Sequence, residues 1–168
     1  MQVITTRLEA EEAKIIYQET AGLAIITINR PQAKNALTAN MWDELARIAL
    51  LTLENPKNKV LLIRGAGENF TAGSDIKEFN SISLKDAEEA FIHMENTIST
   101  IENLPIPVIG VINGPAMGAG LELALACDIR IGSDNARLGI PVGKLGITLN
   151  NKFAKRLVDL VGPSKTED

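Results

Sequence analysis

The chain has 168 residues, of which 45% are hydrophobic and 23% charged, as is typical of a globular protein with its own core. Its formal net charge of -4 gives no electrostatic support for binding nucleic acid. The single cysteine, Cys127, excludes an internal disulfide and favours a reducing compartment. No apolar stretch approaches the length of a membrane span, and 1–14 lacks the apolar core of a signal peptide. We therefore expect a cytoplasmic protein with no membrane or nucleic-acid partner.

The first half of the chain predicts a hairpin, a helix and a buried strand. Apolar residues on both sides of Ala21-Gly22 are typical of two strands joined by a tight turn. Met41, Leu45 and Ile48 recur at the spacing of one helix face, and Asn55-Pro56 ends that helix. The predicted elements are strands over 15–19, 23–29 and 60–63, and a helix that follows 35–38.

A second helix comes next, followed by a strand, a turn and a third helix. Ser83 is a suitable N-cap for the second helix, with Asp86 three residues later, and Leu104-Pro105 ends it. The β-branched run 108–112 predicts a buried strand, which a Gly-rich turn connects to a helix over 121–127. The expected buried stripe of the second helix consists of Leu84, Ala87, Phe91, Met94, Ile98 and Ile101.

The last part of the chain predicts a strand over 128–132, an irregular segment over 136–144 and a helix over 151–161, after which Ser164 begins a further helical segment. Strands that alternate with crossover helices indicate an α/β fold with mainly parallel pairing. No linker, repeat or low-complexity segment divides the sequence, so we expect a single domain over 1–168.

The turn that contains Gly114, Gly118 and Gly120 allows three kinds of site. No Gly-Lys-Ser/Thr follows the glycines, which excludes a P-loop. A dinucleotide fingerprint would need an acidic residue at a strand end about 20 residues later, and none stands there. An oxyanion site remains, because the first turn of a helix presents free N–H groups and the positive end of its dipole. The alternative is that the turn forms no site, because close packing of the helix on the strand would require the same small residues.

Four segments form a joint pattern along the chain: 29–37, which includes Asn35-Ala36-Leu37; 70–76, which includes Ala72-Gly73-Ser74-Asp75; 107–128; and 136–146. Together they resemble the crotonase, or enoyl-CoA hydratase/isomerase, superfamily. The resemblance implies a crotonase-like spiral of ββα units and an acyl-CoA thioester as substrate, in fatty acid metabolism. It implies no cofactor besides the coenzyme A of the substrate. No spacing of His and Cys residues in the sequence indicates a metal site.

In this family two backbone N–H groups bind the thioester carbonyl, and the resemblance assigns them to Ser74 and Ala119. Two fixed donors stabilise an enolate without reorganising, which is how an oxyanion hole works. A Ser74 hydroxyl that caps a turn is compatible with this role, because only the N–H is required. Glu122 matches one of two glutamates that hydratases use for water activation and proton transfer.

Further residues match the part of the family's site that lies along the CoA moiety. Lys34 and Ala36 match the segment near the adenine and phosphates. The strip along the acyl-CoA corresponds to Ala72, Asp75, Ile76 and Lys77. Lys34 and Lys77 are equally well explained as solvated surface lysines.

The sequence departs from the hydratase pattern at two positions. Val142 stands where the second glutamate is expected, and a valine side chain can neither donate nor accept a proton. Asn150 stands where hydratases carry a glycine close to the water site. Glu122 would then be the only acid–base group, which suits proton transfer between two carbons, as in an isomerase, better than hydration. One carboxylate could also assist decarboxylation or hydrolysis next to a stabilised enolate.

The family's members are considerably longer, and the resemblance implies C-terminal helices after 162–164 that this chain lacks. It also implies a homo-oligomer, either a trimer or a dimer of trimers. The alternative to an enzyme is a non-catalytic crotonase-fold domain that acts in ligand binding or assembly. Outside the motifs, we expect His93 at the surface, Asp128 as an anchor between helix and strand, and Cys127 in the core.

Overall fold

A computed structural model of the chain describes residues 14–79, 81–141 and 148–166. Its main sheet has five strands in the order β1-β2-β3-β4-β6. β1 pairs antiparallel with β2, and every other neighbouring pair is parallel, so the predicted α/β fold with mainly parallel pairing is confirmed. The strands are β1 (Ile15–Thr20), β2 (Leu23–Ile28), β3 (Val60–Gly65), β4 (Val108–Ile112) and β6 (Ile129–Gly132).

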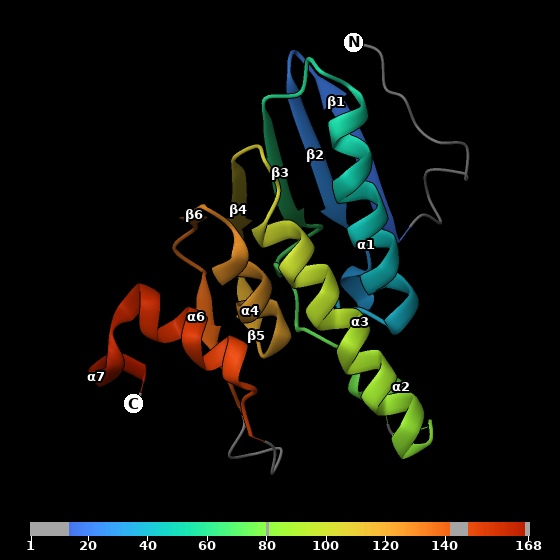
Figure 1. Cartoon of the computed structure of the whole chain (residues 1–168), viewed down its shortest axis with the longest axis vertical. Coiled ribbons are helices and arrows are strands. Elements are labelled where there is room, and N and C mark those ends of the chain that lie inside the picture. The colour runs from blue at the N-terminus through green and yellow to red at the C-terminus, as the bar shows by residue number, and fades with distance from the viewer. Residues whose placement is uncertain (1–13, 80, 142–147, 167–168) are drawn as a thin grey trace.

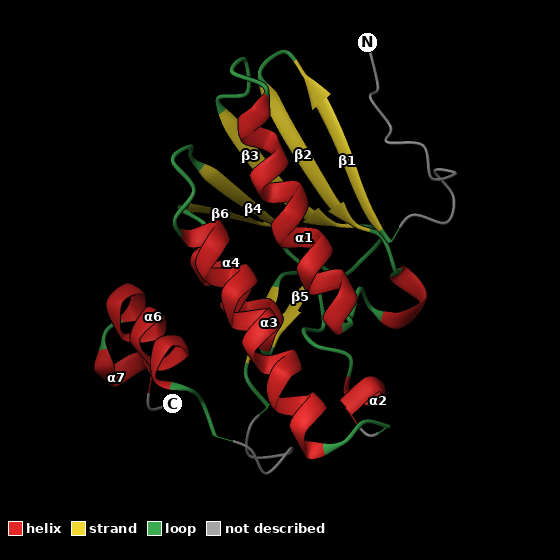
Figure 2. Ribbon diagram, turned by 45° about the vertical axis from the view of Figure 1, so that its right-hand side comes forward, coloured by secondary structure: helices red, strands yellow, loops and turns green. Residues whose placement is uncertain are grey.

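Two long helices, α1 (Ala39–Leu51) and α3 (Leu84–Glu102), lie side by side in both ribbon views, in front of the sheet (Figures 1 and 2). α6 and α7 lie at the end of the molecule away from β1 (Figure 1). None of the helices in the described ranges is long and apolar enough to cross a bilayer. The remaining helical segments are η1 (Pro31–Ala33), η2 (Thr52–Glu54), α2 (Ile76–Phe79), α4 (Ala119–Ala126), α6 (Asn151–Val161) and α7 (Pro163–Thr166).

Local sequence signals account for the turn and the helix starts. Ala21 and Gly22 both have positive φ, 48° and 86°, as the tight turn between two twisted antiparallel strands requires. The Thr38 side chain accepts the Met41 N–H at 3.3 Å and so caps α1. The Ser83 hydroxyl accepts the Asp86 N–H at 3.2 Å, which confirms the predicted cap of α3.

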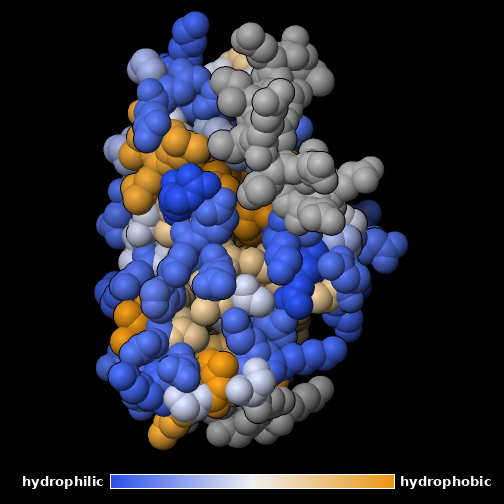
Figure 3. All heavy atoms as spheres, turned by 90° about the vertical axis from the view of Figure 1, so that its right-hand side faces the viewer, coloured by the Kyte–Doolittle hydropathy of each residue, from blue (hydrophilic) through white to orange (hydrophobic). Residues whose placement is uncertain are grey.

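The core lies between the sheet and the helices α1 and α3. The predicted face of α1 is confirmed, since Met41, Leu45 and Ile48 are all buried. The largest fully buried side chains include Trp42, Phe70, Ile26, Ile63 and Ile98. In Figure 3 the outer face on the side of α1 carries mostly hydrophilic side chains, and apolar ones appear there in small groups, which fits a core turned inward.

The predicted buried stripe of α3 is wrong at its N-terminal end. Leu84 is 79% exposed and Phe91 is 48% exposed. The first turns of α3 extend past the sheet (Figure 1), so they have no core to cover. Phe91 packs instead on Phe79 of α2, with ring centroids 4.9 Å apart. The buried residues of α3 are Ala90, Met94, Thr97, Ile98 and Ile101.

A second, two-stranded sheet was not predicted. β5 (Pro115–Met117) pairs in parallel with β7 (Arg137–Gly139), within segments expected to be a turn and irregular chain. Strands of three residues are too short to show a period in the sequence. β5 leads directly into α4, which begins at Ala119 rather than at Leu121.

Candidate active site

The two segments predicted to form the oxyanion site lie against each other. The Phe70 N–H donates to the Pro115 carbonyl, and the Met117 N–H donates to the Thr71 carbonyl, each at 3.1 Å. A side chain at Gly73, whose φ is +87°, would place its Cβ 2.9 Å from the backbone nitrogen of Ala119. Only glycine fits at this contact, which brings the backbone beside Ser74 up to Ala119.

The N–H groups of Ser74 and Ala119 point away from the hydrogen bonds of their own segments. A parallel bridge to Leu37 uses the Gly73 carbonyl and the Asp75 N–H, each at 2.8 Å, so the intervening Ser74 N–H faces the opposite side. Ala119 is the first residue of α4, where an N–H has no acceptor within the helix. Neither N–H donates to another atom of the described ranges. Both are therefore available to an oxyanion.

The Ser74 hydroxyl takes part in packing rather than in a turn. It accepts a hydrogen bond from the Trp42 indole N–H at 3.1 Å and lies 3.4 Å from the Met94 sulfur. Trp42 is held in α1 and Met94 in α3, so both long helices fix the position of Ser74. The side chain thus fixes the position of the residue without using its backbone N–H.

Glu122 lies one helical turn after Ala119 on α4, so the two residues share a face of the helix. The glutamate is only 1% exposed. Burial and the negative charge of Glu95 raise the pKa of the Glu122 carboxyl to about 8, although Arg156 opposes this rise. The raised pKa favours the protonated form of Glu122 at neutral pH.

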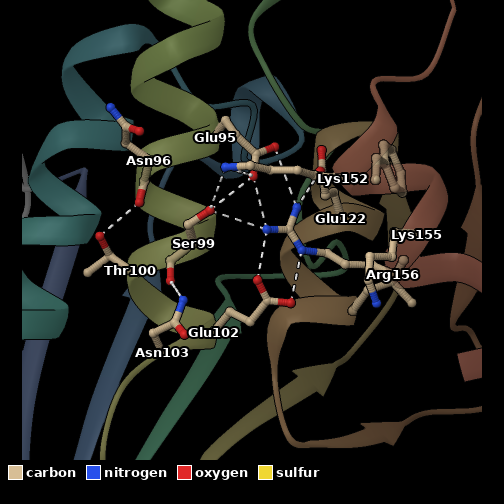
Figure 4. Close-up of polar contacts among 12 residues, drawn as sticks. Glu95, Asn96, Ser99, Thr100, Glu102, Asn103, Glu122, Lys152, Lys155 and Arg156 are labelled. Atoms are coloured by element: carbon tan, nitrogen blue, oxygen red, sulfur yellow. Dashed lines mark hydrogen bonds and ion pairs between the residues drawn. The ribbon is translucent and has the colours of Figure 1, made fainter. Parts of the chain in front are cut away.

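Arg156, on α6, was not predicted to be part of the site. Its Nη1 lies 2.6 Å from Glu122 Oε1, and its Nη2 lies 3.0 Å from Glu95 Oε1 and 2.9 Å from Glu102 Oε2 (Figure 4). Phe153, Arg156 and Leu157 are the buried residues of α6. An arginine on the apolar face of an amphipathic helix was the sequence signal that could have revealed this contact.

The residues predicted to follow the CoA moiety come from two segments that run side by side. The Ala72 N–H donates to the Lys34 carbonyl at 3.0 Å, and the Thr71 hydroxyl donates to the Asn35 carbonyl at 2.6 Å. The structure thus brings Lys34 and Ala36 next to Ala72. The side chains of Lys34, Ile76 and Lys77 are exposed, and those of Ala36 and Ala72 are half-buried.

Asp75, by contrast, is buried and already has partners. Its Oδ2 lies 2.6 Å from Nη1 of Arg30, and its Oδ1 accepts the Lys77 N–H at 2.9 Å. The same Arg30 nitrogen donates to the Ala36 carbonyl at 3.1 Å. The hydrogen bond from Arg30 lowers the pKa of Asp75, so the carboxylate is charged and joins the two segments.

Of the two positions that depart from the hydratase pattern, the structure describes only Asn150. Val142 lies outside the described residues. Asn150 is the N-cap of α6, where its Oδ1 accepts the Phe153 N–H at 2.7 Å. Its Nδ2 donates to Glu95 Oε2 at 3.3 Å. A residue expected only to obstruct a water site is thus part of the hydrogen bonding around Glu95.

The residues outside the motifs are found where they were expected. His93 is at the surface, with Nδ1 2.6 Å from Asp43 Oδ1. Asp128 Oδ2 accepts the Val108 N–H at 2.7 Å and so anchors the start of β4. Cys127 is buried in the core. No group of His, Cys, Asp and Glu side chains in the described ranges has the arrangement of a metal site.

Comparisons with known proteins agree with the fold. The sequence model of the enoyl-CoA hydratase/isomerase family matches residues 18–168. YngF of Bacillus subtilis is 40% identical over 147 residues, and the crotonyl-CoA hydratase of Syntrophomonas wolfei is 38% identical over 150 residues. These matches cover 87% and 89% of this chain, but 56% and 58% of the two relatives.

Solved structures are similar over the same part. The crystal structure of an enoyl-CoA hydratase from Bacillus anthracis matches with a TM-score of 0.88 at 34% identity, over 92% of this chain and 61% of that protein. The chain belongs to the enoyl-CoA hydratase/isomerase family and has the crotonase fold. It spans a little more than half the length of the relatives that it matches.

Proposed function

We propose that this protein is an enzyme that binds an acyl-CoA thioester and stabilises the enolate of its acyl group, with Glu122 as the acid–base residue. The family supports the class of substrate. The observation that carries the proposal is the approach of two available N–H groups, of Ser74 and Ala119, on the helix start that also bears Glu122.

Enolate formation follows from these groups. The thioester oxygen accepts hydrogen bonds from the two N–H groups, and negative charge grows on it as the α-carbon loses its proton. The carboxylate form of Glu122 takes that proton. Return of the proton to the α-carbon exchanges it with solvent, and delivery to the γ-carbon of an enoyl group moves the double bond.

Proton transfer between carbons suits this site better than hydration. Addition of water needs one group that activates the water and a second that protonates the neighbouring carbon. Val142 cannot supply the second group. We therefore propose an isomerase-like activity that exceeds hydration of the double bond.

Calorimetry with butyryl-CoA and exchange of its α-protons in D₂O test the oxyanion site. Proline is tolerated at the first position of a helix, so Ala119→Pro removes one N–H donor from α4 without breaking the helix. We expect exchange to fall about 10²-fold or more in this variant. Ala119→Gly keeps the donor and should retain exchange. Equal rates in the two variants would contradict the proposed oxyanion hole.

The alternative, a non-catalytic acyl-CoA-binding domain, is supported by the burial of Glu122 beneath Arg156. Binding and α-proton exchange of butyryl-CoA, measured together, distinguish the two functions. Binding of butyryl-CoA with no α-proton exchange at any pH between about 6 and 10 would establish the alternative and reject the enzyme.

We also propose that the protein forms a homo-oligomer, a trimer or a dimer of trimers. Exposed apolar side chains support this assembly, including Ile129 and Ile131 on β6, and Leu160 and Val161 on α6. Light scattering should give a mass of at least three chains. A uniform monomer at high micromolar concentration would contradict it.

A further inference from the structure

Glu95 of α3 and Glu122 of α4 both contact the guanidinium group of Arg156 (Figure 4). Arg156 Nη1 lies 2.6 Å from Glu122 Oε1 and 3.5 Å from Glu95 Oε2, so one nitrogen contacts both carboxyl groups. Both carboxyl groups therefore lie against the same guanidinium nitrogen. Two carboxyl groups this close favour a form in which they share a single proton.

The charges around Glu95 and Glu122 also favour a form in which the two carboxyl groups share one proton. Glu122 contacts Arg156 of α6, which also pairs with Glu95 and Glu102 of α3, and Lys152 of α6 pairs with Glu95. With Glu122 included, the carboxyl groups outnumber the cations by one. A cluster of this composition is neutral when one carboxyl group carries a proton.

Burial decides which carboxyl group holds the proton most of the time. The Glu122 side chain is 1% exposed, whereas those of Glu95 and Glu102 are 15% and 40% exposed. Hydrogen bonds from Arg156 and Ser99 lower the pKa of Glu95 although burial opposes them. Glu122 therefore holds the proton, and Glu95 holds the charge and is the member of the pair nearer to solvent.

We propose that Glu95 is a positioning residue that shares one proton with Glu122 and thereby serves as the second carboxyl group of the site, which Val142 does not supply. Its role in catalysis rests on the proposed function. The pair itself is a property of the protein without substrate, so it can be measured separately.

The proton balance of such a pair is simple. The O–H bond of Glu122 breaks and an O–H bond forms on Glu95, which makes Glu122 the carboxylate. Glu122 then takes the α-proton of the acyl group, and the electron pair of the broken C–H bond moves to the thioester oxygen as the enolate. Glu95 passes its proton to water through its exposed edge. The reverse steps return a solvent proton to the substrate.

Carbon-13 NMR of protein labelled at the glutamate carboxyl carbons measures the pair directly, with Glu122 assigned from the signal missing in Glu122→Gln. We expect Glu95→Gln to lower the pKa of Glu122 by about one unit or more, because the neighbouring charge is removed. Glu102→Gln is the matched control, since Glu102 also pairs with Arg156 and is not among the groups that shift Glu122. An equal effect of the two variants, or none, would overturn the proposal.

Exchange of the α-protons of butyryl-CoA tests the role in catalysis. We expect Glu95→Gln to shift the pH profile of exchange to lower pH and Glu95→Asp to restore most of the original profile, while thermal unfolding confirms that both variants fold. Exchange with an unchanged profile in Glu95→Gln would reject the role of Glu95 and leave the proposed function intact. A shared proton seen by NMR in a protein without any exchange would reject the proposed function and leave the pair intact.

Discussion

The indole N–H of Trp42 donates a hydrogen bond to the hydroxyl oxygen of Ser74 across 3.1 Å. Trp42 is 1% exposed, so its N–H has no access to water and depends on this acceptor. The same contact ties the loop that carries Ser74 to α1. The side chain of Ser74 thus serves the structure, whereas the role proposed for this residue in binding requires only its backbone N–H.

Ser74→Ala separates these two functions of one residue. The variant leaves the buried Trp42 N–H without its acceptor, which should lower the free energy of unfolding by about 1–3 kcal/mol in urea titrations. The backbone N–H stays in place, so α-proton exchange should remain within about tenfold of the original rate. Loss of exchange by several orders of magnitude in a folded variant would mean that the hydroxyl itself takes part in the chemistry.

Gly120→Ala tests the close approach of the two oxyanion segments. Its Cβ would lie 2.4 Å from the backbone oxygen of Thr71, which forces the start of α4 away from the loop. We expect this variant to lose most acyl-CoA binding and at least about 2 kcal/mol of stability. Gly132→Ala is the control, because its Cβ would meet only Ala136 at 3.4 Å. Similar losses in both variants would argue against a specific contact at Gly120.

The sequence predicted those parts of the fold that are marked by a regular spacing of apolar residues or by a capping residue. The face of α1 is marked by Met41, Leu45 and Ile48, and the start of α3 by Ser83. Leu84 has the right spacing to be buried, but spacing alone does not reveal that the sheet ends before the first turn of α3. The strands β5 and β7 are too short to show any period.

In the candidate site, too, the sequence predicted the residues of local motifs but not the contacts between distant segments. Backbone donors at Ser74 and Ala119 sit in local motifs, so a family resemblance could assign them, and those assignments remain predictions. Arg156 contacts Glu122 and Glu95 over separations of 34 and 61 residues. Such contacts depend on how α3, α4 and α6 pack together, which no local pattern encodes.

The ion pair of Asp75 with Arg30 should make stability depend on acid. Because the pKa of Asp75 is lowered in the folded protein, its contribution is present above about pH 4 and is lost as the pH falls through the lowered value. We expect Asp75→Asn to cost about 1–3 kcal/mol at pH 7 and less at pH 3, measured by urea unfolding. A cost that is the same at both pH values would show that the charge of Asp75 does not stabilise the fold.

Cys127 should be inert toward thiol reagents in the folded protein. The side chain is 3% exposed, and burial raises the pKa of its thiol to about 12, so little reactive thiolate forms at neutral pH. Reaction with a maleimide should be complete within minutes in urea and negligible over the same time in buffer. Rapid labelling without denaturant would contradict the packing of α4 against β4.

The most direct test of the proposed enzyme compares two rates in the same preparation. We predict that the protein exchanges the α-protons of butyryl-CoA in D₂O faster than it adds water to crotonyl-CoA, and that Glu122→Gln abolishes both reactions. This result follows from an enolate held by Ser74 and Ala119 beside one acid–base residue that contacts the substrate. Hydration that outpaces exchange, or exchange that persists in Glu122→Gln, would contradict the account.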